Sequence, residues 1–337
     1  MNTYIYDLDE YATNERNGTY GGKAGEKEGI NINGEPWIVK YPKSTRGMRG
    51  DLDSYTTSPL SEYIGSHIYQ MIGIDAHDTI LGYRNNQIVV ACKDFCQHSG
   101  DLREIRTLKN IYNKELADRL ETSISSTSDS HLIDLEDMKI HFEFNPILKI
   151  LPEVQTRFWD QIIVDGLIGN NDRNNGNWGI LLEDGEYKLA PVFDNGASFS
   201  NKLPDRKIKD MLQSPERLNK SLEMTKTIYQ IDGKQLFVKD LINIDDRGFY
   251  DSIIRKIPII AERITEIKRF ISDIPQMYNG LIVCSDERKE FYSFCVEERF
   301  KQYLVPVLEK TDKELGIERN VLLSLEKQKD NHGIERE

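Results

Sequence analysis

Two predicted β-hairpins with a single helix between them make up the first 95 residues, and this order constrains the fold more than any other feature. Strand-like apolar runs lie at residues 30–32, 37–40, 79–83 and 87–92. Asn33-Gly34 separates the first two runs and favours a type I′ turn, because both residues tolerate positive φ. Ser58 as N-cap and Pro59 in the first turn predict a helix start, and apolar residues follow at helical spacing: Leu60, Ile64, Ile68, Met71 and Ile72. The segment therefore predicts a small sheet that carries one helix.

The chain after residue 95 is predicted to be mainly helical. Apolar residues at helical spacing indicate a helix over residues 153–168, and Pro258 and Ser285 each mark a further helix start. A hairpin is expected at residues 178–182 and 186–193. We therefore expect an α+β fold of two lobes and a tail: a β-rich N-lobe at residues 1–95, a larger helical C-lobe at residues 96–325 and a charged tail at residues 326–337.

The charge and composition argue against several classes of protein. Lys and Arg total 44 while Asp and Glu total 56, which gives a formal net charge of −12. This excess of negative charge argues against a general electrostatic grip on nucleic acid or on an anionic membrane. No apolar run approaches the roughly 20 residues of a membrane-spanning helix, and the first residues have no secretory leader pattern. We therefore expect a cytoplasmic protein.

The cysteines and histidines show no metal-binding signature. None of the four cysteines belongs to a CxxC pair, and the six histidines form no HExxH motif. Buried, reduced thiols are the expected state of cysteines with such spacing. A metalloenzyme built on His and Cys is therefore not expected.

A polar loop between a helix and a strand carries the strongest chemical signal. Asp172 is followed five residues later by Asn177, and Asp194 ends the next predicted strand pair. In a phosphoryl-transfer site, one Asp orients the attacking hydroxyl and accepts its proton, while the Asn and the second Asp hold Mg²⁺. The Asp172 to Asn177 loop alone, or the segment ending at Asp194 alone, is explained equally well by residues that merely form turns. Both together, in this order, predict a site for ATP and Mg²⁺.

The N-terminal part supplies the residues that such a site needs. Lys40 ends a strand, and Glu62 on the predicted helix is its natural partner. The chain before the first strand is glycine-rich, which lets backbone N–H groups approach phosphates, and its candidate binding residues are Gly21, Gly22, Gly25 and Lys27. Taken singly, the glycines also fit an ordinary loop, Lys40 also fits a solvated strand end, and Glu62 also fits a favourable interaction with a helix dipole. Their order is what indicates a phosphate-binding lobe.

These segments together resemble the HipA-like serine/threonine kinases, and among them the compact CtkA-type branch without an additional N-terminal subdomain. The resemblance runs from about residue 20 to about residue 200. It implies a bilobal, protein-kinase-like fold with Asp172 as catalytic base, Asn177 and Asp194 as Mg²⁺ ligands and Lys40 as the phosphate-binding lysine. It also implies that the hinge from Lys93 to Phe95 meets the adenine of ATP through backbone groups.

Two positions depart from the family pattern. The family often has His two residues after the catalytic Asp, and this chain has Asn174, which brings no charge to a phosphate. We expect slower turnover, or compensation by the neighbouring Arg173. The glycine-rich loop also lacks the serine whose autophosphorylation switches HipA off, and Thr19 is the nearest hydroxyl.

The leading functional prediction is an ATP- and Mg²⁺-dependent kinase acting on Ser or Thr of another protein. The resemblance further implies a toxin-type kinase with a translation factor as its target and a neighbouring antitoxin as its partner. The basic stretch at residues 43–49 has two interpretations: it lines the mouth of the cleft, or it is a solvated loop.

Two alternatives to a protein kinase stay open. The Asp172 to Asn177 loop is also similar to that of phosphatidylinositol kinases, so a lipid or small-molecule kinase is the runner-up. Against it, the segment after Asp194 is not strongly basic and no basic amphipathic membrane helix is evident. The third interpretation is a catalytically weak nucleotide-binding scaffold. Direct binding to nucleic acid or membrane is not expected.

Overall fold

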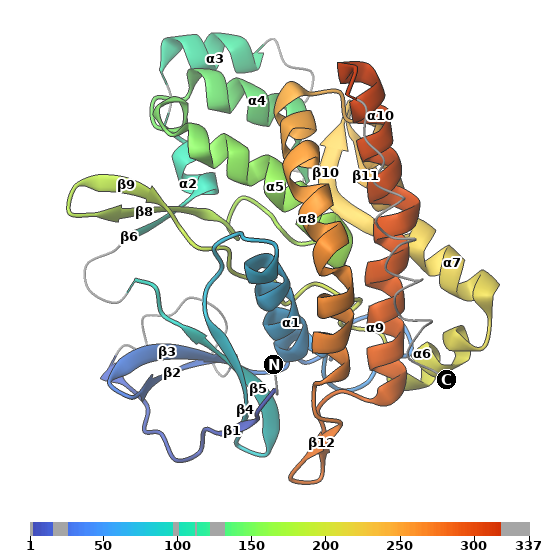
Figure 1. The fold of residues 1–337 in the computed structure, drawn as a ribbon. Coiled ribbons are helices and arrows are strands. Elements are labelled where there is room, and N and C mark those ends of the chain that lie inside the picture. The colour runs from blue at the N-terminus through green and yellow to red at the C-terminus, as the bar shows by residue number, and fades with distance from the viewer. Residues whose placement is uncertain (1–2, 16–25, 97–100, 112, 122–131, 318–337) are drawn as a thin grey trace.

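The two predicted hairpins join in one five-stranded sheet (Figure 1). The computed structural model describes residues 3–15, 26–96, 101–111, 113–121 and 132–317. The sheet has the strand order β1-β4-β5-β3-β2, and β1 pairs parallel to β4 while the other pairs are antiparallel. Asn33 and Gly34 connect β2 to β3 with φ of +52° and +83°, as the type I′ prediction requires. The strands are β1 (Tyr6–Asp7), β2 (Lys27–Ile32), β3 (Glu35–Lys40), β4 (Thr79–Arg84) and β5 (Gln87–Lys93).

The two faces of this sheet bury different partners because side chains alternate along a strand. On β5, Val90 and Cys92 pack in the cluster that contains α1 (Ser58–Met71), whereas Val89 and Ala91 belong to a separate cluster. That second cluster lies among the strands and the N-terminal segment and consists of Leu8, Ile30, Ile32, Trp37, Val39, Val89 and Ala91. The helix therefore covers one face of the sheet only.

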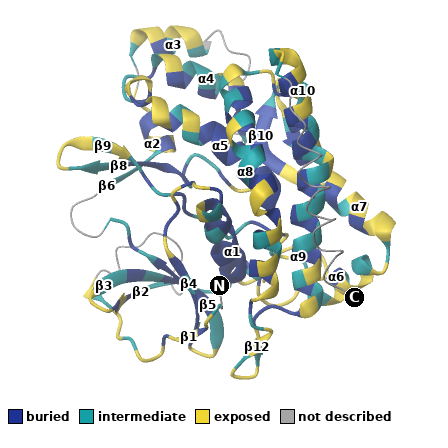
Figure 2. Ribbon diagram, viewed as in Figure 1, coloured by how far each residue is buried: buried dark blue, intermediate teal, exposed yellow. Residues whose placement is uncertain are grey.

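Helix α1 is buried on nearly all sides, because it lies between the sheet and the C-terminal helix α8 (Figures 1 and 2). The predicted N-cap is wrong by one residue: Thr57 occupies the cap position and Ser58 is the first helical residue. The hydroxyl of Ser58 accepts a hydrogen bond from Thr56 Oγ1 at 3.0 Å instead of capping a helix N–H. Pro59 lies in the first turn as predicted.

The remaining chain is mainly helical, as predicted. Its helices are α2 (Ile105–Lys109), α3 (Lys114–Glu121), α4 (Leu135–Phe144), α5 (Pro152–Ile168), α6 (Asp205–Leu212), α7 (Pro215–Glu223), α8 (Arg247–Ser272), α9 (Asp286–Arg299) and α10 (Val305–Leu315). A π-helical turn at Phe300–Leu304 joins α9 to α10, and 3₁₀ turns lie at Leu148–Ile150 and Val238–Asn243. Among the described helices, none is both long and apolar enough to cross a membrane.

Short strands complete the C-terminal part. They form a sheet β6-β8-β9, a sheet β11-β10-β7 and a hairpin β12-β13. Their bounds are β6 (Asp101–Glu104), β7 (Ile133–Asp134), β8 (Gly179–Glu183), β9 (Glu186–Leu189), β10 (Lys226–Ile231), β11 (Lys234–Phe237), β12 (Met277–Tyr278) and β13 (Leu281–Ile282).

Two predicted boundaries in this part are wrong. Helix α8 begins at Arg247 and runs through Pro258, because the Asp246 side chain caps it by accepting the N–H groups of Gly248 and Phe249. Strand β9 ends at Leu189, earlier than predicted, because the chain then leaves the hairpin to pair with the segment before β4. The predicted N-cap Ser285 is confirmed, since its hydroxyl accepts the N–H of Arg288.

One hydrophobic cluster continues from α1 into the C-terminal helices. It contains Ile64 and Ile68 of α1 together with Ile162 of α5, Ile264 of α8 and Phe291 of α9. The predicted α+β fold, with a small β-rich part and a larger helical part, is confirmed. The division at residue 95 stays a prediction, and the predicted tail at residues 326–337 and the serine-rich stretch at 125–130 lie outside the described residues.

Candidate active site

Helix α5 leads directly into the predicted catalytic loop. The helix ends at Ile168, and Gly169 follows with φ of +68°, a left-handed conformation that suits glycine. The Asn170 side chain then connects helix and loop: its amide donates to Asp165 Oδ1 at 3.1 Å and its oxygen accepts the N–H of Asp172 at 3.1 Å. These contacts hold Asp172 in an exposed position on the wall of a cleft.

Two asparagines surround Asp172. Asn174 Nδ2 donates to Asp172 Oδ1 at 3.1 Å, and Asn177 Nδ2 donates to the backbone oxygen of Asp172 at 2.5 Å. The N–H of Asn177 also donates to the backbone oxygen of Asn174 at 2.8 Å, which closes the loop on itself. The amide at the position where the family often has His therefore contacts the predicted base itself.

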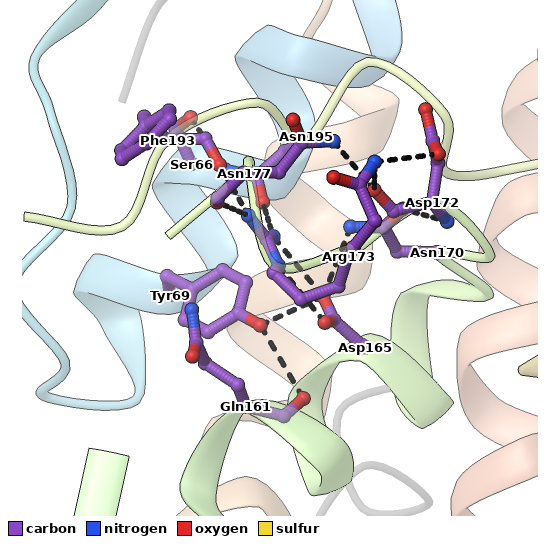
Figure 3. A network of polar contacts seen from close by, with 11 residues as sticks. Ser66, Tyr69, Gln161, Asp165, Asn170, Asp172, Arg173, Asn177, Phe193 and Asn195 are labelled. Atoms are coloured by element: carbon purple, nitrogen blue, oxygen red, sulfur yellow. Dashed lines mark hydrogen bonds and ion pairs between the residues drawn. The ribbon is translucent and has the colours of Figure 1, made fainter. Parts of the chain in front are cut away.

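Arg173 is buried and joins this loop to α5 and to the segment after β9 (Figure 3). Its Nε lies 3.0 Å from Asp165 Oδ2, and its Nη1 donates to the backbone oxygen of Asn177 at 3.0 Å. It also donates to the backbone oxygen of Phe193 and to Asn195 Oδ1. The expectation that Arg173 compensates for a missing charge at the phosphate is therefore wrong, because its guanidinium is fully engaged in the interior.

Asp194 follows Phe193 and has a backbone φ of +58°, the left-handed region that non-glycine residues rarely adopt. Its carboxylate lies 2.5 Å from Lys40 Nζ, and its side chain is 34% exposed toward the cleft. Burial raises the pKa of Asp194, but the Lys40 ammonium outweighs this effect and the net shift is downward. Asp194 is therefore held as a carboxylate that faces the same cleft as Asp172.

Lys40 and Glu62 form the predicted ion pair. Lys40 ends β3, and its Nζ lies 3.2 Å from Oε1 of Glu62, which is buried on α1. Burial lowers the pKa of Lys40, but the carboxylates of Asp194 and Glu62 outweigh it and raise the pKa above its usual value. Burial raises the pKa of Glu62, but Lys40 and His77 outweigh it and the net shift is downward. The site therefore keeps both groups charged.

His77 contacts this ion pair and was not predicted as a site residue. Its Nε2 lies 2.9 Å from Glu62 Oε1 and 3.1 Å from Ser66 Oγ, and the ring is buried. Asn195 Nδ2 donates to the same Ser66 hydroxyl at 3.0 Å and its Oδ1 accepts from Arg173. A chain of polar contacts thus runs from Lys40 to the predicted catalytic loop. No motif in the sequence marks His77, whereas Asn195 stands next to the predicted Asp194.

The predicted residues meet in one cleft of about 890 Å³. They come from segments far apart in the sequence: Lys27 is on β2, Lys40 on β3 and Glu62 on α1, and the others follow α5 or β9. The predicted residues that line the cleft are Lys27, Lys40, Glu62, Asp172, Asn174, Asn177 and Asp194.

The predicted hinge residues Lys93 and Phe95 do not line this cleft. The Lys93 ammonium pairs with Glu35 at 2.7 Å, and its backbone N–H donates to the Asp78 oxygen at 2.8 Å. The Phe95 ring lies against Phe193, with 5.6 Å between ring centroids. Adenine contact at this segment therefore stays a prediction. The glycine-rich loop with Gly21, Gly22 and Gly25, and the candidate Thr19, lie outside the described residues.

The tertiary structure brings together one cluster of metal-ligand types that the sequence spacing did not indicate. Ligand atoms of Glu62, His77 and Cys92 all lie within 4.8 Å of one another. Burial strongly raises the pKa of the Cys92 thiol, and Lys40 already contacts the Glu62 carboxylate. The thiol therefore stays protonated. Cys92, Cys284 and Cys295 are buried free thiols, as predicted, whereas Cys96 is only half-buried.

Comparisons with known proteins identify the family. No family model matches the chain. The serine/threonine-protein kinase CtkA of Helicobacter pylori is 31% identical over 285 residues, which are 83% of this chain and 81% of that protein. The crystal structure of the Helicobacter pylori proinflammatory kinase CtkA covers 94% of this chain and 100% of its own, with a TM-score of 0.77 and 27% identity.

A further solved structure contains HipA with HipB and operator DNA from Shewanella oneidensis. It covers 86% of this chain and 68% of its own, with a TM-score of 0.47 and 15% identity. The relation to CtkA spans most of either chain. This chain therefore belongs to the CtkA-type family of serine/threonine protein kinases.

Proposed function

We propose that this kinase transfers the γ-phosphoryl group of ATP to a Ser or Thr hydroxyl of another protein, with Asp172 as the base. The observation that carries the proposal is the meeting of Asp172, Asn177, Asp194 and Lys40 in one cleft. Membership of the family implies ATP and a divalent metal as general requirements.

Asp172 is suited to receive the proton of the attacking hydroxyl. Its side chain is exposed to the cleft, and Asn174 Nδ2 donates to one carboxylate oxygen at 3.1 Å. One oxygen is thus fixed while the carboxylate stays open to a substrate hydroxyl. The backbone contacts from Asn170 and Asn177 limit the movement of the loop. Orientation of the nucleophile is the main contribution that such a base makes to phosphoryl transfer.

The donor set of Asn177 and Asp194 fits Mg²⁺. Amide and carboxylate oxygens are the hard ligands that this ion takes in kinases, and both side chains face the cleft. Bound Mg²⁺ offsets the charge that develops on the phosphate oxygens. Arg173 supports the ligand pair by donating to the backbone oxygens of Asn177 and of Phe193, the residue before Asp194.

Lys40 would bind the phosphates next to these ligands. Glu62 holds the ammonium at 3.2 Å from the α1 side, and His77 contacts the same carboxylate oxygen at 2.9 Å. Because Glu62 is buried and its pKa is lowered, it remains an anion that keeps Lys40 in the cleft across the neutral range. Lys27 on β2 adds a second cation to the same wall.

The test is transfer of label from γ-labelled Mg-ATP to generic protein substrates. Asp172→Asn is expected to retain nucleotide binding and to reduce transfer by at least about 10²-fold, because only the orienting carboxylate is lost. Asp184→Asn, in the exposed β8–β9 turn where φ is +52°, is the matched control and should transfer normally. Transfer by Asp172→Asn at the wild-type rate would remove Asp172 from the role of base.

The lipid-kinase alternative has less support. Arg206 pairs with Asp51 at 2.5 Å and also contacts Asp53, while Lys207 donates to the Asp51 backbone oxygen at 2.8 Å. These cations after Asp194 are thus neutralised within the chain instead of facing a phosphorylated headgroup. Phosphoinositide vesicles belong in the same labelling assay, where label in lipid would favour this alternative.

We also propose, from the family resemblance alone, a toxin-type action in the cytoplasm on a translation factor, regulated by an antitoxin. Controlled expression in a bacterial host should then arrest growth, and Asp172→Asn should not. Phosphoproteomics of the arrested cells would identify the target. Normal growth with active kinase present would argue against a toxin.

A further inference from the structure

The cleft extends beyond Asp172, and its two parts differ in charge. All four carboxylates in its wall belong to the part proposed to take ATP and metal: Glu26, Glu62, Asp172 and Asp194. The rest of the wall, which we call the outer cleft, is formed by the 43–56 loop, residues 196–203 and residues 221–226. Within these ranges, the charged residues that line the cleft are Lys43, Lys202 and Lys226. A cationic surface is unexpected in a chain of net charge −12.

None of the described carboxylates neutralises these three lysines. Within the described ranges, no carboxylate lies within 4.0 Å of any of their ammonium groups, and Lys43, Lys202 and Lys226 are all exposed. The two aspartates of the 43–56 loop, Asp51 and Asp53, do not neutralise these lysines, because both pair with Arg206 of α6. The charge of the outer cleft is therefore available to a ligand.

A fourth cation lies behind the same wall. Arg299 is 2% exposed and donates to the Leu167 backbone oxygen at 3.2 Å and to Thr225 Oγ1 at 3.3 Å. Among the described residues, its Nε has no hydrogen-bond acceptor and no carboxylate pairs with its guanidinium. Thr225 lines the outer cleft next to Lys226. The buried charge therefore adds to the positive potential at this end of the cleft.

Two methionines give the outer cleft an apolar component. Met48 is 40% exposed and Met224 is 56% exposed, and both line the wall together with Leu52. Exposed methionines adapt to side chains of different shapes, which suits recognition of a peptide better than recognition of a rigid small molecule. The wall thus combines unpaired cations with flexible apolar contacts.

We propose that the outer cleft binds the segment of the substrate protein around the phosphoacceptor, and that this segment is acidic and carries a large apolar side chain. This inference deepens the proposed function and rests on it, because the phosphoacceptor is placed by Asp172. The carboxylates of the segment would pair with Lys43, Lys202 and Lys226, and the apolar side chain would contact Met48 or Met224. The cationic charge of the outer cleft, its exposed methionines and the extension of the cleft wall to residues 196–203 and 221–226 support a peptide as the occupant.

Two peptides distinguish this inference from its alternatives. Both carry one Ser and one Leu, and the flanking residues are Asp and Glu in one and Lys and Arg in the other. Binding to the Asp172→Asn protein is measured by fluorescence anisotropy, which requires no transfer. We expect the acidic peptide to bind more tightly, and we expect the preference to fall as salt rises. Failure of the wild-type protein to transfer label would contradict the proposed function without deciding this binding result.

Charge reversal tests the lysines individually. Lys202→Glu and Lys226→Glu should each lower the affinity for the acidic peptide by about two- to five-fold, the range for exposed ion pairs. Each should also raise the affinity for the basic peptide. A gain for the basic peptide cannot result from misfolding. Lys234→Glu, an exposed site on β11 outside the cleft wall, is the matched control and should change neither affinity.

Three outcomes would overturn the inference. The first is equal binding of both peptides or tighter binding of the basic one. The second is no binding of either peptide. The third is an RNA oligonucleotide of equal charge that binds as tightly as the acidic peptide, which would show an unspecific anion site.

Discussion

Replacing Asp165 with Asn tests whether the buried Arg173 is what connects the proposed catalytic loop to the proposed metal-binding segment. Asp165 and Arg173 are each about 1% exposed at the side chain, and two contacts of 3.0 and 3.2 Å join them. Asp165 also accepts hydrogen bonds from Tyr69 at 2.8 Å and from Asn170 at 3.1 Å. The substitution removes the charge and places an NH₂ group among donors, so Arg173 becomes an uncompensated buried cation.

The expected loss follows from that burial. Removing one partner of a buried ion pair costs about 3–5 kcal/mol, because the remaining charge has no counter-ion. With a urea m-value of about 3 kcal/mol/M, this loss lowers the unfolding midpoint by roughly 1–1.7 M. Transfer activity should fall as well under conditions where the variant is folded, because Arg173 donates to Asn177 and to the segment before Asp194.

A surface pair supplies the matched control. Asp251 pairs with Arg247 at 3.0 Å one turn away on α8, with side chains 43% and 70% exposed. Asp251→Asn should cost no more than about 0.5 kcal/mol and leave transfer unchanged. The reasoning is refuted if urea unfolding gives the two variants the same small loss. A double variant, Asp165→Asn with Arg173→Met, should lose less than the sum of the single losses, because it removes the unpaired charge.

Three further outcomes are expected. Asp194→Ala should abolish the thermal stabilisation that Mg-ATP gives the wild type, and an unchanged shift in Tm would contradict its assignment as a metal ligand. His77→Gln should raise KM for ATP more than it lowers kcat, because the Glu62 partner is lost while Asp172 is unaffected; equal kinetics would make His77 dispensable. Arg84 lowers the pKa of Glu28 to about 2, so the stability that this pair provides is complete above pH 4.5 and is lost as pH falls toward 2. Glu28→Gln should make stability depend less on pH below pH 4.5. An acid-unfolding curve identical to that of the wild type would contradict the lowered pKa of Glu28.

Local signals in the sequence determined most of the elements around the site. Asn33-Gly34 marked its hairpin because few residue pairs tolerate two positive φ values, and Ser285 marked its helix because a hydroxyl can cap free N–H groups. Where two local signals competed, sequence reasoning failed. Pro258 looks like a helix start, but the Asp246 cap and the apolar pattern continue one helix through it.

The residue types with defined chemistry were likewise visible in the sequence. Asp172, Asn177 and Asp194 have spacings that phosphoryl transfer requires, so they could be selected without coordinates. The roles of the neighbouring residues could not, because Arg173 and Asn174 both looked able to reach a phosphate. In the structure one is buried against Asp165 and the other contacts Asp172.

The sequence by itself therefore indicated which residues are candidates for the chemistry and on which elements they lie, because turns, caps and periodicity are properties of short segments. Only the tertiary structure decided which side chains form ion pairs and hydrogen bonds with one another. His77 joins Glu62 and Ser66 although no motif contains it, and unpaired lysines from three segments meet in the outer cleft. Such contacts depend on how α1, β3 and the loops after α5 pack together. Burial then sets the strength of each interaction, and burial is a property of the whole fold rather than of any segment.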